Sequence, residues 1–166
     1  MKLDNLKKLY IEQLKDLYSA ENQLTEALPK MAKAATSAAL QRAFRDHLRE
    51  TESQIQRIET IFEDLEYSPR GPKCKAMAGL IEESEELINE DGDPDVIDAG
   101  LIAAAQRVEH YEIAGYGTVH KYATMLQDKE AAKLLQQTLD EEYGADKKLG
   151  ELAGEINVDA MAEEAS

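Results

Sequence analysis

Two glutamates three residues apart, Glu109 and Glu112, lie in a segment whose composition favours a long α-helix. At this spacing the two carboxylates share one face of the helix. That face is otherwise apolar on both sides of the pair, at Leu101, Ala105, Val108, Gly115, Val119 and Ala123. A buried carboxylate that is ionised and unpaired costs several kcal/mol, so the pattern predicts that something compensates the two charges.

Three more glutamates interrupt apolar helical stripes elsewhere in the chain. Glu21 precedes the first of two predicted turns by about fifteen residues, and Glu50 follows it by about as many. Glu112 and Glu142 bracket the second predicted turn in the same way. Equal distances from the turn of an antiparallel helix pair place residues opposite each other. We therefore expect a cluster of five carboxylates: Glu21, Glu50, Glu109, Glu112 and Glu142.

Five carboxylates in an apolar interior repel one another unless they are protonated or bind cations. Two divalent metal ions would offset four of the five charges. Oxygen-rich ligation suits Fe(II), Mn(II) or Mg(II) better than zinc, which usually takes histidine and cysteine. The alternative is that individual glutamates face solvent or pair with Lys or Arg. Their matching depth favours a site for two divalent metal ions, with iron expected first and manganese second.

The elements that must position these side chains follow from apolar residues that recur every three or four positions. Four long helices are predicted, over residues 3–34, 38–66, 95–126 and 128–156. The turns between them lie at Thr36-Ser37 and at Gln127-Asp128. A loop with Ser-Pro-Arg-Gly-Pro and a shorter helix over about 74–89 join the two hairpins.

This order predicts an all-α fold, a four-helix bundle of two helical hairpins joined by a crossover that carries a short extra helix. We expect one domain over residues 1–156. Residues 157–166 are acidic and rich in alanine, and we expect them to form a loose tail.

Composition excludes several classes of partner. The formal net charge of −15 argues against binding nucleic acid or an anionic membrane surface, because nothing forms a basic stripe. No apolar run is long enough to span a bilayer. The N-terminus has no uninterrupted hydrophobic signal region, and the single cysteine, Cys74, suggests a reducing compartment. We therefore expect a cytoplasmic protein.

The chain resembles the YciF family of bacterial stress-response proteins, within the ferritin-like superfamily. The segments that carry the resemblance span nearly the whole chain, at 17–24, 47–51, 80–83, 109–114 and 138–142. Among them are Glu109-His110-Tyr111-Glu112-Ile113-Ala114 and Thr138-Leu139-Asp140-Glu141-Glu142. The resemblance implies a ferritin-like bundle, a homodimer and a candidate di-iron site.

The rubrerythrin branch of that superfamily has carboxylates at the positions of all five glutamates, but its two site histidines are replaced here by Ser53 and Ala145. Gln54 and Asp146, each one residue later, could reach the metals instead, as could His47 one turn before Glu50. This departure argues against ordinary di-iron redox chemistry and predicts either weaker metal binding or a preference for manganese.

The leading interpretation of the site is a di-metal stress protein that oxidises Fe(II) or reduces peroxide, with O₂ or peroxide as its reaction partner. The chain has no Cys-x-x-Cys pair, so electrons would come from a separate donor. The alternative is a non-enzymatic, stress-induced helical protein that acts structurally or through partners, with a structural or vestigial metal site. Iron storage in a closed cage is a third interpretation, which the resemblance disfavours.

Overall fold

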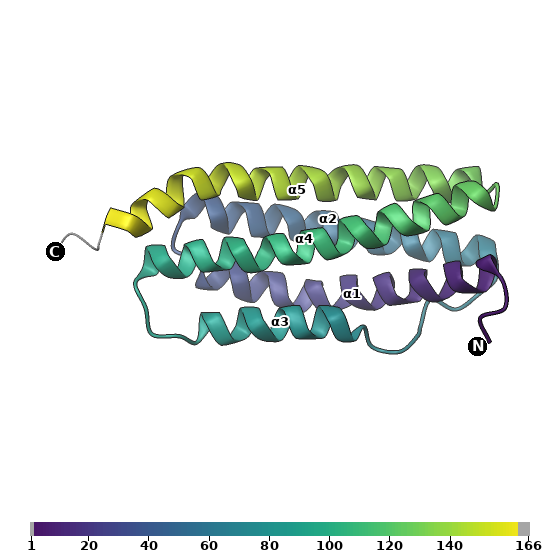
Figure 1. Ribbon diagram of the computed structural model, residues 1–166, viewed down its shortest axis with the longest axis horizontal. Coiled ribbons are helices and arrows are strands. Elements are labelled where there is room, and N and C mark those ends of the chain that lie inside the picture. Colours follow the sequence, from purple (N-terminus) through teal and green to yellow (C-terminus); the bar gives the residue numbers. More distant parts are fainter. Residues whose placement is uncertain (1, 163–166) are drawn as a thin grey trace.

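A computed structural model describes residues 2–162, which fold into an elongated bundle of helices (Figure 1). The helices are α1 (Leu6–Ala34), α2 (Ala38–Leu65), α3 (Lys75–Ile88), α4 (Pro94–Met125) and α5 (Lys129–Ala162). α1 pairs with α2 and α4 with α5, while the short α3 packs on α1 and α4 along one side of the bundle. The predicted all-α bundle of two hairpins, with a short helix in the crossover, is confirmed.

Capping side chains set where the helices begin. The Asn5 side chain accepts a hydrogen bond from the backbone N–H of Lys8, so α1 starts at Leu6 rather than at residue 3. Ser37 caps α2 and Asp93 caps α4. Pro94 stands at the first position of α4, where its missing N–H costs nothing.

The C-terminal helix is longer than predicted. It continues through Ala162, so the expectation of a loose tail from residue 157 is wrong for its first six residues. Ile156 is still packed against the core, and the alanines and Met161 that follow are good helix formers. Residues 163–166 lie outside the described part of the chain.

The apolar core is divided into two halves by a polar layer. One half lies toward the α1–α2 turn and the other toward the α4–α5 turn. The first contains Leu24, Leu28, Leu40, Phe44, Leu101 and Leu152. The second contains Tyr10, Leu14, Ile58, Phe62, Tyr116 and Leu135. The buried acidic residues lie between the two halves, so the candidate site is enclosed by packed side chains in both directions along the bundle.

One carboxylate from the second hairpin fixes the turn of the first. Asp98 on α4 is buried and accepts hydrogen bonds from the backbone N–H groups of Thr36 (2.8 and 3.2 Å) and Ser37 (2.6 Å). This contact ties the α1–α2 turn to α4 and so helps to set how the two hairpins sit against each other.

None of the helices in residues 2–162 is long and apolar enough to cross a membrane.

Candidate metal centre

Four buried side chains from three helices meet in the polar layer: His47 on α2, Glu109 and Glu112 on α4, and Glu142 on α5. One potential ligand atom from each lies within 4.8 Å of the others. The second hairpin contributes Glu109, Glu112 and Glu142 and the first contributes His47, so side chains of both hairpins meet in this layer.

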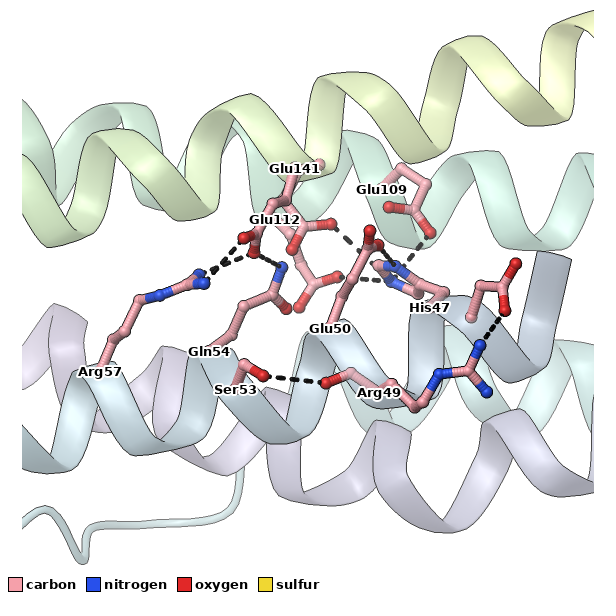
Figure 2. Close-up of polar contacts among 11 residues, drawn as sticks. His47, Arg49, Glu50, Ser53, Gln54, Arg57, Glu109, Glu112 and Glu141 are labelled. Carbon is pink, nitrogen blue, oxygen red and sulfur yellow. Dashed lines mark hydrogen bonds and ion pairs between the residues drawn. The ribbon is translucent and has the colours of Figure 1, made fainter.

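His47 stands at the centre of this group. Its Nε2 atom lies 3.3 Å from a carboxylate oxygen of Glu109, 3.8 Å from Glu142 and 4.0 Å from Glu112. Its Nδ1 atom lies 3.3 Å from Glu50. Figure 2 shows the imidazole between the carboxylates of Glu50 and Glu109. The ring thus occupies the position that a cation would take among these carboxylates.

Glu21 lies beside the group on α1, and it is fully buried. One of its carboxylate oxygens accepts a hydrogen bond from the phenol of Tyr116, while the other has no hydrogen-bond partner. The bond to Tyr116 fixes the orientation of the carboxylate. Its close electrostatic neighbours are Glu142 and Glu112, so the first hairpin also contributes an acid to the layer.

Many buried polar atoms in this layer have no hydrogen-bond partner, which is rare in folded proteins. They are Nε2 of His47, Oε1 of Gln54, both oxygens of Glu112 and Glu142, and one oxygen each of Glu21 and Glu109. These atoms are one nitrogen and seven oxygens, a donor set that suits iron or manganese. The residues present therefore fit divalent metal ions.

The metal-free electrostatics are strained. Burial, together with the charge of Glu142, raises the pKa of Glu21 to about 8 despite the hydrogen bond from Tyr116. Burial likewise raises the pKa values of Glu109, Glu112 and Glu142. Burial alone would lower the pKa of His47, but the carboxylate of Glu109 and the hydrogen bond with Glu50 outweigh it and raise that pKa to about 10. Without metal, the layer therefore holds protons tightly.

Glu50 lies at the edge of the group rather than inside it. Its side chain is 44% exposed, and it contacts His47 through Nδ1. His47 and Glu50 are three positions apart on α2, so they share a face of the helix, and the imidazole takes the inner position. Glu50 as a metal ligand stays a prediction.

Asp146 is directed elsewhere. It accepts a hydrogen bond from Gln106 and pairs with the exposed ring of His110, both at 3.3 Å. This pairing holds α4 against α5 outside the four-residue group. A role for Asp146 as a ligand stays a prediction.

The sequence analysis did not predict an ion pair between Arg57 and Glu141, which lies beside Gln54. The Arg57 guanidinium binds both carboxylate oxygens of Glu141 at 2.7 Å, and Gln54 donates its amide to the same carboxylate at 3.1 Å (Figure 2). A carboxylate only accepts, so the amide nitrogen of Gln54 must face Glu141. A charged residue on the inner side of α2, one turn after Gln54, was the available signal.

Comparison with known proteins assigns the chain to a family whose profile, "Domain of unknown function (DUF892)", matches residues 5–162. The chain belongs to the DUF892 family. Protein YciF of Escherichia coli (strain K12) is 48% identical over 154 residues, which cover 92% of this chain and 93% of YciF. The resemblance to the YciF family is confirmed.

Solved structures agree with this DUF892 assignment. The crystal structure of the E. coli stress protein YciF has a TM-score of 0.90 at 47% identity and covers 92% of this chain and 97% of its own. YcfI of Rhodopseudomonas palustris, described as a candidate structural protein, has a TM-score of 0.87 at 41% identity, with 90% and 95% covered. The predicted ferritin-like bundle is thereby confirmed.

Proposed function

We propose that this chain is a metal-binding stress protein whose buried centre holds two divalent ions, iron or manganese, and oxidises Fe(II) or reduces peroxide. Its ligands would be His47, Glu21, Glu109, Glu112 and Glu142, with Glu50 at the edge and Gln54 beside them. The observation that carries the proposal is the set of unpartnered buried oxygen and nitrogen atoms around one point. Membership in the YciF family supports the stress role.

When bound, a pair of ferrous ions supplies two electrons, which with two protons convert hydrogen peroxide into two water molecules. The chain's own residues would prepare the site. Nε2 of His47 must lose its proton before it can ligate, because only the neutral imidazole binds metal. Glu50, joined to Nδ1 and exposed at its other side, would pass protons between His47 and solvent. Tyr116 would hold Glu21 in a fixed orientation.

The second candidate is a non-enzymatic structural protein. The central position of His47 favours it, since an imidazolium offsets one carboxylate and protonation of the other buried acids would remove the remaining charge without any metal. One similar structure is described as a candidate structural protein. Under this alternative the buried acids would serve packing or partner binding. A cytoplasmic location and a homodimer are part of both proposals.

Metal content and Fe(II) oxidation test the two candidates directly. The protein is reconstituted anaerobically with Fe(II), freed of loose metal, analysed for iron and then treated with hydrogen peroxide. We expect about two ions per chain and rapid peroxide-dependent oxidation. The isosteric variant Glu112→Gln/Glu142→Gln should lose both.

The matched control is Glu151→Gln/Glu155→Gln, which makes the same charge change at exposed positions of α5. It should behave like the wild type. Tight binding without oxidation would leave a structural metal site. If the wild type retains no metal, the metal proposal is wrong and the metal-free structural protein stands.

A further inference from the structure

A cavity of about 430 Å³ opens from the surface between α2 and α5 and reaches the metal centre. Its buried lining includes His47 and Glu109, which carry unpartnered atoms in the candidate site. Its exposed lining includes Arg42 on α2 and Lys148 on α5. The volume falls in the range of small-molecule pockets and is far more than peroxide or O₂ needs.

The mouth of this cavity carries two cations without an acidic partner. Of the acids in the lining, Asp46 pairs with Arg49 and Glu141 with Arg57, while Glu50 and Glu109 share the single ring of His47. Within residues 2–162, Arg42 and Lys148 pair with no acid. Both cations therefore stand at the opening with no carboxylate of this part of the chain bound to them.

The wall between these cations and the centre is mostly apolar. It is formed by Ala43 and Phe44 on α2 and by Ala145 and Leu149 on α5. Gly144 leaves further room, because a Cβ atom placed there would meet nothing within 4 Å. A ligand that matches the whole cavity therefore has an apolar body and an anionic end.

We infer that this cavity, at the mouth of the centre, binds a small amphipathic carboxylate, held by Arg42 and Lys148. The apolar body would lie along α2 and α5 and point toward His47. That the bound molecule would lie between solvent and two metal ions rests on the proposed function. Its binding in the cavity does not, so the two can fail separately.

Binding is measured by calorimetry on the metal-free chain with two probes of equal length and opposite charge, octanoate and octylammonium. We expect octanoate to bind and octylammonium to bind at least about tenfold more weakly, because the free charges are positive. Arg42→Gln/Lys148→Gln should weaken octanoate binding about fivefold, as expected for two exposed ion pairs. The control Arg45→Gln/Lys147→Gln removes two exposed cations outside the cavity and should change nothing.

A second variant fills the cavity without disturbing the core. Gly144→Leu should abolish octanoate binding, while Gly154→Leu, at another open position of α5, should retain it. Equal binding of the two probes, or unchanged octanoate binding in Gly144→Leu, would overturn the inference. A third result would also overturn it: the wild type does not bind octanoate, and Gly144→Leu changes the oligomeric state. The cavity would then be a contact surface between copies of the chain. Iron content of the same variants reports on the metal proposal independently.

Discussion

At the scale of single residues, the buried acids of the polar layer lower the stability of the metal-free fold. Glu21, Glu112 and Glu142 are fully buried, and most of their oxygens make no hydrogen bond. Folding the metal-free chain near neutral pH therefore requires protonating or desolvating acids that are ionised in the unfolded chain. Such strain is expected at functional sites and serves no purpose in packing alone.

Removing two of these charges should stabilise the metal-free protein. In Glu112→Gln/Glu142→Gln, neutral amides replace acids whose pKa values burial raises, and they can donate hydrogen bonds to Glu21 and Glu109. We expect a gain of about 1–3 kcal/mol in the free energy of unfolding at neutral pH. Urea unfolding in the presence of a chelator measures it, with Glu151→Gln/Glu155→Gln as the control. A loss of stability instead would mean that the ionised acids are well paired in the native state.

The burial of Glu21, Glu109, Glu112 and Glu142 was predictable from the sequence because each interrupts an apolar stripe, whereas Glu50 is partly exposed. Which of them lie inside the group was less so. Glu50 and His47 occupy neighbouring positions on the inner face of α2, and periodicity cannot tell which of two residues three apart points further inward. The ion pair of Arg57 with Glu141 depends on α2 meeting α5, a contact between hairpins on which spacing within one helix carries no information.

At the scale of elements, the layer is assembled only if the two hairpins keep their register. Helix α4 supplies two of the four grouped residues, and it also holds the α1–α2 turn through Asp98. Hydrophobic periodicity and caps located every helix to within a few residues. The end of α5 was missed because the acidic, alanine-rich composition of residues 157–162 suits both a helix and a loose tail.

Breaking the Asp98 contact should destabilise the bundle and loosen the hairpin register. Asp98→Ala leaves the backbone N–H groups of Thr36 and Ser37 without their acceptor, and we expect a loss of about 1–3 kcal/mol. Asp91→Ala, at an exposed position just before α4, is the control. Urea unfolding gives the free energy. A change below that of the control would show that water satisfies the turn equally well.

At the scale of the whole molecule, metal, protons and folding are coupled. Raised pKa values of buried acids make protonation favour the native state. For Glu21, whose pKa rises from 4.5 to about 8, this contribution is fully present below pH 4.5 and is lost as the pH rises through about 8. For His47, raised from 6.5 to about 10, the loss comes later but has the same sign. Metal ions compete with those protons for the same atoms.

The melting temperature of the metal-free protein should therefore fall by about 5–10 °C between about pH 5 and pH 9. Manganese, which avoids oxidation by air, should raise the melting temperature more at the alkaline end, because its ligands are then free of protons. Thermal unfolding monitored by circular dichroism, with chelator or with Mn(II), measures both effects. In Glu112→Gln/Glu142→Gln the pH dependence should flatten and the Mn(II) effect should vanish. A wild-type protein that gains stability across this pH range without metal would show that the buried acids are ionised and paired in the native state, and the coupling of metal to protons at this layer would then be wrong.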